Sequence, residues 1–145
     1  MGRIAFLFAG QGAQVPGMAG DVKDLPKVKK LFDLAESIQP GVVDKMLSGT
    51  QEELNRTLLT QPTMFLADLA YAHAKEEELG APDCVCGFSV GEVPALCFAG
   101  ALSEEDAFRA IVKRAELMEA YTQRVAGCML AVVKLPADQV EALCD

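Results

Sequence analysis

The sequence predicts an α/β protein, because segments typical of buried strands alternate along the chain with segments typical of helices. The first of them, residues 4–9, is a continuous apolar run that ends at glycines, as expected of a buried parallel strand and its turn. A second short strand is predicted at 83–86, and a glycine-rich turn follows it as well. Helical segments separate the two strands, so the predicted order begins β, several α, β.

Three helices are predicted between these strands from their terminal signals. The first covers 26–37 and opens with a proline, which fits the first turn of a helix. After a Pro-Gly break at 40–41, the sequence Thr-Gln-Glu-Glu is a capping box for a short helix at 50–59. A longer helix is predicted from Pro62 to the glycine at position 80, a residue type that often follows a helix C-terminus.

The second half of the chain continues the alternation. A helix is predicted at 91–98, where Pro94 is tolerated because it lies in the first turn. A Ser-Glu-Glu-Asp cap begins a helix at 103–124. A strand at 129–135 and the start of a helix at 136–143 follow. The complete order β, several α, β, α, α, β, α is that of α/β proteins.

Composition indicates one globular domain and argues against a nucleic-acid-binding or membrane protein. The 145 residues are 51% hydrophobic and 23% charged, which suffices for a buried core. The formal net charge of -8 argues against nucleic-acid binding, since phosphate contacts require a basic surface. No stretch is long enough to span a membrane, and the apolar run at 4–9 is too short for the core of a signal peptide.

The cysteines indicate a reducing, cytoplasmic environment. Their number is odd, and no spacing among them matches a zinc site. We therefore expect all of them to be reduced thiols in a cytosolic protein, without a bound metal. The five positions are Cys84, Cys86, Cys97, Cys128 and Cys144.

The segment Gly-Phe-Ser-Val-Gly-Glu at 87–92 places Ser89 between a predicted strand and a predicted helix. A nucleophilic serine at such a point requires a tight, strained turn that exposes its hydroxyl at the end of the sheet. Flanking glycines are needed because bulkier residues would clash, and the amide of Val90 is an expected oxyanion donor. The pattern also occurs by chance in ordinary βα turns, but the strand before it and the helix after it favour a nucleophile.

A second glycine-rich turn, Gly-Gln-Gly at 10–12, follows the first predicted strand. Its backbone amides are free, and its glycines permit close approach. It lacks the lysine of a phosphate-binding P-loop. From these residues alone, an ordinary βα turn is the favoured interpretation.

Arg114 lies on the apolar face of its predicted helix. At about 100° per residue it falls close in angle to Ala107 and Met118. A buried guanidinium is costly unless it is paired, and the partner is either a carboxylate of the protein or an anionic ligand. From the residues alone an internal salt bridge is slightly favoured, although the planar guanidinium also suits a ligand carboxylate.

His73 is the only histidine, and it provides no evident base for the serine. It lies on the predicted helix 62–80 beside a run of acidic residues, so we expect it on the solvent side. A serine hydroxyl needs a neighbouring base to act as a nucleophile at neutral pH. The residues therefore predict a nucleophile, Ser89, whose base is not identified.

Four segments of the chain carry a family resemblance. They are 6–14 (FLFAGQGAQ), 60–62 (TQP), 87–92 (GFSVGE) and 113–118 (KRAELM). Together, in this order and spacing, they resemble the N-terminal half of malonyl-CoA:acyl-carrier-protein transacylase, the acyltransferase of fatty-acid and polyketide synthesis. The resemblance extends over essentially the whole chain.

The resemblance implies a role for each residue of the site. Ser89 would take the malonyl group from malonyl-CoA as an ester, and the amides of Gln11 and Val90 would form the oxyanion hole. Arg114 would bind the free carboxylate of the malonyl group, which would explain its place on an apolar face. Gln61 would line the pocket. Acyl-carrier protein would then receive the malonyl group by ping-pong kinetics, with no metal or redox cofactor.

Two features differ from the family pattern. Many members have histidine where this chain has Phe88, a position that bears on the shape of the acyl pocket and its selectivity. The family enzyme is also about twice as long, and its catalytic histidine lies in the half without a counterpart here. We therefore expect these residues alone to be nearly inactive, and to require a complementing C-terminal chain or to self-associate.

The resemblance also implies the domain organisation. Residues 1–126 would be an incomplete large subdomain with an α/β-hydrolase-like parallel sheet and flanking helices, and residues 127–145 would begin a ferredoxin-like small subdomain. Two other functions remain open at this point: a serine esterase of the α/β-hydrolase type, and a non-catalytic assembly module. Arg114 argues against the esterase, because neutral esters need no buried cation.

Overall fold

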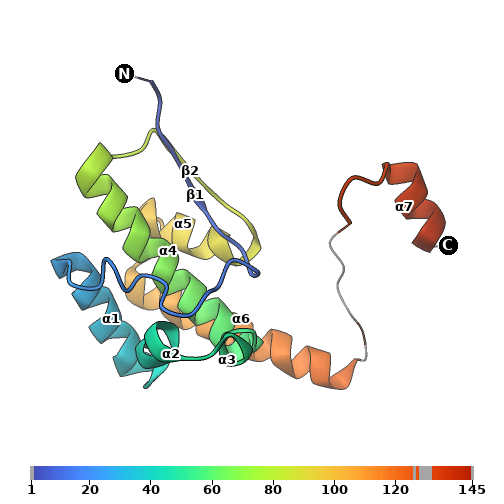
Figure 1. Cartoon of the computed structure of the whole chain (residues 1–145), viewed down its shortest axis with the longest axis horizontal. Helices are drawn as coiled ribbons and strands as arrows, with labels where there is room; N and C mark the ends of the chain where they lie inside the picture. Colours follow the sequence, from blue (N-terminus) through green and yellow to red (C-terminus); the bar gives the residue numbers. More distant parts are fainter. Residues whose placement is uncertain (1, 126, 128–131, 145) are drawn as a thin grey trace.

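The computed structural model describes residues 2–125, 127 and 132–144, and its elements are consistent with the α/β class. Helix α4 runs through the middle of the molecule, with the two strands on one side and α1 and α2 on the other (Figure 1). The elements are β1 (Ala5–Phe8), α1 (Pro26–Ile38), α2 (Val42–Ser48), α3 (Gln51–Leu54), α4 (Thr57–Leu79), β2 (Cys84–Gly87), the 3₁₀ turn η1 (Ser89–Gly91), α5 (Glu92–Phe98), α6 (Glu104–Arg124) and α7 (Ala137–Cys144).

Strands β1 and β2 pair in parallel, as the sequence predicts for the first strand. Their register places Phe8 opposite Gly87, so the two strands end at the same edge of the sheet. The Phe88 N–H extends the ladder there by donating to the Phe8 carbonyl at 3.1 Å. At the opposite end the Asp83 carboxylate accepts the Ile4 N–H at 2.7 Å. The turns that follow the two strands are therefore neighbours.

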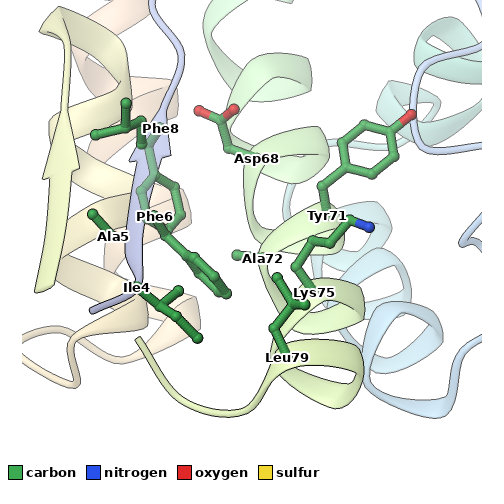
Figure 2. A pocket seen from close by; sticks show the side chains of 10 residues that line it. Ile4, Ala5, Phe6, Phe8, Asp68, Tyr71, Ala72, Lys75 and Leu79 are labelled. Carbon is green, nitrogen blue, oxygen red and sulfur yellow. The ribbon is translucent and has the colours of Figure 1, made fainter. Parts of the chain in front are cut away.

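The expectation that the first strand is buried is wrong for the described part of the chain. Within that part β1 has one neighbouring strand, β2, and Leu7 is 79% exposed. A groove of about 380 Å³ separates β1 from α4 on the side away from β2 (Figure 2). Its lining is mostly apolar, and α4 contributes the polar side chains Asp68, Tyr71 and Lys75. A continuous apolar run indicates that both faces of a strand are to be buried, but it does not identify the segment that packs against them.

The core is built around α4, which packs against α1, α2, α3, α5 and α6. The helix is weakly amphipathic because residues 60–67 are buried on all sides. Phe65 meets Phe108 of α6 with ring centroids 5.7 Å apart, and both residues are fully buried. Burial of such large apolar side chains is a main source of stability.

The start of α4 corrects a prediction, because the helix begins at Thr57 and Pro62 lies inside it. A proline in a helix interior cannot donate to the carbonyl four residues earlier. That carbonyl belongs to Leu58, and it accepts a hydrogen bond from the Gln39 side chain at 3.4 Å instead. A side chain distant in the sequence thus compensates for the missing donor.

The segment between α1 and α4 is partly predicted. The capping box is confirmed: the Glu53 N–H donates to Thr50 Oγ1 at 3.2 Å, and the Thr50 N–H donates to the Glu53 carboxylate at 2.9 Å. The helix that it caps ends at Leu54, however, and not near residue 59. Helix α2 was not predicted, because it has no side-chain cap and starts from Gly41 at a φ of 84°.

The last part of the chain is described in part. The predicted strand 129–135 falls partly outside the described residues, and residues 132–135, which are described, are irregular. The helix predicted at 136–143 is confirmed as α7, which has no buried residue and stands apart from the other elements in Figure 1. The division into residues 1–126 and 127–145 stays a prediction.

The four described cysteines are free thiols, and three of them are exposed. Cys97 is buried, and burial raises the pKa of its thiol to about 11. The fifth, Cys128, lies outside the described residues. Among the described helices, none combines the length and the apolar character needed to cross a bilayer. The described side chains also contain no cluster of three or more potential metal ligands.

The Phe65–Phe108 contact generates a stability prediction. Phe108→Ala removes a fully buried ring between α4 and α6 and is expected to cost about 3–5 kcal/mol of unfolding free energy. Leu117 of α6 is 59% exposed, so Leu117→Ala is the matched control and is expected to cost no more than about 0.5 kcal/mol. Urea unfolding followed by circular dichroism measures both, and equal losses would contradict this account of the core.

Candidate active site

Ser89 occupies a strained turn between β2 and α5. Its φ of 53° lies in the left-handed region, which non-glycine residues adopt at a cost of about 1–3 kcal/mol. The chain passes from β2 through the extended residue Phe88 into η1 and then into α5, so the strand–turn–helix context is confirmed. Backbone strain of this kind is typical of residues held in position for a function.

The two flanking glycines allow the turn to pack closely. A Cβ at Gly87 would collide with the backbone of Gly91, and a Cβ at Gly91 would collide with the carbonyls of Phe8 and Ala9. The expected clash of bulkier residues is therefore confirmed. The contact of Gly91 with the end of β1 also joins the Ser89 turn to the first strand.

Arg114 reaches from α6 to the serine. One guanidinium nitrogen, Nη2, lies 3.3 Å from Ser89 Oγ and donates to it. The other, Nη1, donates to the Oε1 atom of Gln61 on α4. Gln61 is fully buried, and its Nε2 lies 3.3 Å from the sulfur of Met118. The buried amide thus holds the guanidinium beside the serine hydroxyl.

The salt bridge favoured for Arg114 from the residues alone is wrong for the described part of the chain. None of the ion pairs formed there includes Arg114, and its partners are the neutral groups of Gln61 and Ser89. A half-buried cation with neutral partners keeps its charge available to an anion. A carboxylate bound by this fork would lie next to Ser89.

The glycine-rich turn at 10–12 lies beside the serine turn. A Cβ at Gly10 would meet the Phe88 carbonyl oxygen at 2.9 Å and also the Phe88 ring, so the two turns are in contact. The amides of Gln11 and Val90 have no hydrogen-bond acceptor among the described residues. Two free N–H groups on adjacent turns are an arrangement that can bind a developing oxyanion.

Phe88 lies at the junction of these two turns. Its side chain is 74% exposed, although its backbone continues the sheet. The ring packs against Gly10 and otherwise faces outward. This residue can therefore shape the approach to Ser89 without contributing a charge.

His73 is placed differently from the prediction, because its side chain is only 14% exposed and packs against Phe98 with ring centroids 5.6 Å apart. Its ring nitrogens lie 4.0 Å from Glu76 and 3.6 Å from Glu104. Glu104 begins α6, and Arg114 lies ten residues further along, which is about 15 Å at 1.5 Å per residue. Within the described residues, the neighbours of the His73 ring are thus Glu76, Glu104 and Phe98, whereas the side-chain partner of Ser89 Oγ is Arg114.

Two further residues near the site were missed by the sequence reasoning. Asp68 of α4 is partly buried, accepts the Ala9 N–H at 3.3 Å, and has its pKa raised to about 7 by burial. Gln14 is 8% exposed and accepts the Gly12 N–H at 2.7 Å. The available signal for Asp68 is a lone acid in the otherwise apolar and neutral part of α4.

The profile of the family described as acyl transferase domain matches residues 5–144. The chain belongs to this family. The chain is 35% identical to malonyl CoA-acyl carrier protein transacylase of Bacillus subtilis. This alignment covers 100% of the chain and 46% of the relative. It is 35% identical to the human mitochondrial malonyl-CoA-acyl carrier protein transacylase, covering 95% of this chain and 37% of that one.

Solved structures agree with these sequence matches. The crystal structure of MCAT from Streptococcus pneumoniae superposes with a TM-score of 0.84 at 37% identity, covering 97% of this chain and 46% of that chain. A malonyl-transacylase in complex with a type II PKS acyl-carrier protein matches with a TM-score of 0.74 at 34% identity, covering 82% and 40%. The resemblance to malonyl transacylases is confirmed. The chain spans about half the length of the relatives that it matches.

The Gln61–Arg114 contact of this acyl transferase domain generates a second prediction. In a double-mutant cycle of Gln61→Leu and Arg114→Met, the coupling free energy is expected to be about 1.5–3 kcal/mol, because a half-buried charged donor loses its neutral acceptor. The exposed Glu105–Arg109 pair of the same helix is the control and is expected to give about 0.3–0.5 kcal/mol. Urea unfolding of the variants measures both cycles, and coupling no larger than in the control would contradict the assigned contact.

Proposed function

We propose that the protein containing this chain transfers a malonyl group from malonyl-CoA to acyl-carrier protein, with Ser89 carrying the group as an ester. The observation that supports this most is the Arg114 guanidinium, which lies at hydrogen-bond distance from Ser89 Oγ and pairs with no carboxylate of the described residues. A malonyl thioester carries one free carboxylate, separated from the reacting carbonyl by a single methylene. A cation adjacent to the nucleophile suits this short separation.

Arg114 binds the substrate carboxylate in this proposal, and Gln61 holds the guanidinium. Guanidinium and carboxylate form two parallel hydrogen bonds, which fix the orientation of the substrate as well as its position. Binding frees Ser89 Oγ from its contact with Nη2, so that the hydroxyl turns to the thioester carbonyl. The charge of Arg114 also separates this function from that of a serine esterase, whose neutral substrates need no such partner.

The amides of Gln11 and Val90 stabilise the oxyanion that forms when Ser89 attacks the carbonyl. Two features support this role: both N–H groups are free within the described residues, and both lie on turns in contact with each other. One oxyanion donor typically contributes a factor of about 10²–10³ to the rate. Phe88 borders the same place and contributes to acyl selectivity through its shape.

The reaction proceeds in two half-reactions at Ser89 Oγ. In the first, Oγ attacks the thioester carbonyl, the C–S bond breaks, and coenzyme A leaves as its thiol while the malonyl ester forms. In the second, the thiol of acyl-carrier protein attacks the ester carbonyl and Oγ recovers its proton. Neither half-reaction changes an oxidation state, so the proposal includes no redox cofactor. No metal is included, because the two amides and Arg114 take the charge-stabilising roles in this proposal. Coenzyme A enters only as part of the substrate.

The base that removes the Oγ proton lies outside these 145 residues in this proposal. His73 is the single histidine of the chain, and it packs against Phe98 at a distance from Ser89. The relatives extend well beyond the part that this chain matches. We place the base in the corresponding polypeptide, whether it is continuous with this chain or separate from it.

The finer description of the fold is also a proposal. The parallel β1–β2 pair is the start of an α/β-hydrolase-like sheet that continues on the free side of β1, and residues 127–145 begin a ferredoxin-like subdomain. The exposure of Leu7 and the apolar groove beside β1 support the first part (Figure 2). A complementing C-terminal chain or self-association covers this groove.

The partners and the location follow from the same reasoning. Acyl-carrier protein is named in the relatives and is bound to one of the matching structures. The acidic net charge of -8 supports neither nucleic acid nor an anionic membrane as a partner. We propose a cytoplasmic location for this chain. The relatives include both bacterial and mitochondrial enzymes, so they do not decide the location.

The role of Arg114 is tested by Arg114→Ala in the complete polypeptide that carries this chain. Malonyl transfer is expected to fall about 10²-fold, because a charged hydrogen-bond partner of the substrate is lost. Acetyl transfer, whose substrate has no carboxylate, is expected to change by less than about threefold. Arg109→Ala, on the exposed face of the same helix, is the matched control. Unchanged malonyl transfer in the Arg114 variant would overturn the proposed carboxylate role.

The position of the base is tested with the 145 residues alone. Mixed with malonyl-CoA, they are expected to acylate Ser89 slower by several orders of magnitude than a complete enzyme, because no base faces the hydroxyl. Intact-mass spectrometry records the ester, and Ser89→Ala provides the background. Rapid, stoichiometric acylation of Ser89 would show that a base is present within the chain.

A further inference from the structure

We propose that Asp68 and Gln14 are positioning residues for the oxyanion hole. They hold the turn that carries the Gln11 amide by accepting the backbone N–H groups on either side of it, those of Ala9 and Gly12. This inference rests on the proposed function, in which the Gln11 amide is one of the two oxyanion donors. It adds to that function two side chains that touch neither substrate nor Ser89.

Asp68 holds the entry to the turn. Its carboxylate Oδ1 accepts the Ala9 N–H at 3.3 Å, and Ala9 is the first residue after β1. Figure 2 shows the Asp68 side chain extending from α4 toward β1 across the upper end of the groove. The bond thus joins the end of the strand to the central helix of the core.

Gln14 holds the exit from the turn. Its Oε1 accepts the Gly12 N–H at 2.7 Å, and its Nε2 donates to Asn55 Oδ1 at 2.8 Å. Gln51 holds both Gln14 and Asn55 in place. Its Nε2 donates to Asn55 Oδ1 at 2.9 Å and to the backbone carbonyl of Gln14 at 3.1 Å. Since Asn55 Oδ1 is the acceptor, the Gln14 amide must present its oxygen to Gly12.

The turn itself has little internal support. Its own hydrogen bond, from the Ala13 N–H to the Gly10 carbonyl, is 3.4 Å long. Gly12 has a φ of 113°, which glycine adopts without steric cost, and the absence of a Cβ leaves this part of the backbone unrestrained. An oxyanion donor is effective when it is fixed before the reaction begins. The two side-chain anchors supply the restraint that the turn lacks.

The burial of Asp68 argues for a specific role. Burial raises the pKa of its carboxyl to about 7, and Oδ2 has no hydrogen-bond partner within the described residues. A carboxyl in such a place costs stability, and its one hydrogen bond to Ala9 offsets only part of this cost. The other titratable groups that line this groove are Tyr71 and Lys75 of α4, while β1 contributes only apolar side chains.

The proposal is tested by ¹⁵N relaxation NMR of the 145-residue chain, which reports the backbone motion of the Gln11 N–H. Asp68→Ala and Gln14→Ala are each expected to lower the order parameter of this N–H from about 0.85, typical of rigid backbone, to below about 0.6. Asp68→Asn keeps an acceptor oxygen and is expected to keep the order parameter of the parent chain to within about 0.1. Asp83→Ala is the matched control, because Asp83 accepts an N–H at the other end of β1.

A spectroscopic signature separates positioning from general stability. The Ala9 amide proton is expected to shift downfield with rising pH, with a midpoint of about 7, as Asp68 ionises and its bond to Ala9 strengthens. Asp68→Asn is expected to abolish this titration and leave the fold intact. Amide hydrogen exchange at Ala107, in the core, reports any global loss of stability in every variant.

A kinetic arm links the anchors to the reaction. In the complete polypeptide, Asp68→Ala and Gln14→Ala are expected to lower kcat for malonyl transfer about tenfold, with KM changed by less than about twofold, because oxyanion contacts form in the transition state. An unchanged Gln11 order parameter in both alanine variants overturns the positioning role. If the order parameter falls as expected but Arg114→Ala leaves malonyl transfer intact, the positioning role of Asp68 and Gln14 stands and the proposed function fails.

Discussion

The parallel pairing of β1 and β2 is the constraint on which the site depends. Because Phe8 lies opposite Gly87, both strands end at one edge of the sheet, and their following turns meet there. One turn carries the Gln11 amide, and the other carries Ser89 and the Val90 amide. A slip of one residue in this register would separate them and reverse the faces of the side chains. The close contact of Gly91 with the Phe8 and Ala9 carbonyls opposes such a slip.

Helix α4 carries two side chains that hold other parts of the site in place. Gln61 and Asp68 are seven residues apart, or about two helical turns, so they lie on the same side of the helix. The first holds the guanidinium of Arg114, and the second holds the backbone at Ala9. A single buried helix thus relates the proposed carboxylate site to the proposed oxyanion site. Its central place in the core makes this relation stiff.

The features predicted well from the sequence are those with a local physical cause. The Thr50 capping box, the Ser103 cap and the strained turn at Ser89 each depend on residues within a few positions of one another. The Ser89 turn could be recognised because its strand, its glycines and its helix are contiguous in the chain. The same holds for the apolar sector of α6 that contains Arg114.

The features predicted poorly depend on contacts between distant segments. Pro62 is tolerated inside α4 because Gln39 supplies the missing donor, and the His73 side chain is only 14% exposed because it packs against Phe98. No pattern within either segment contains this information. The neutral partners of Arg114 and the acceptor role of Asp68 likewise arise only when α4 meets α6 and β1.

The contact between Gly91 and the end of β1 has a consequence for thermal motion. Since no side chain separates the two backbones, the Ser89 turn and the end of β1 must be displaced together. The Gln11 turn is joined to the same strand end, where Ala9 is held by Asp68. A thermal displacement of β1 therefore moves both turns in the same direction, although they are far apart in the sequence.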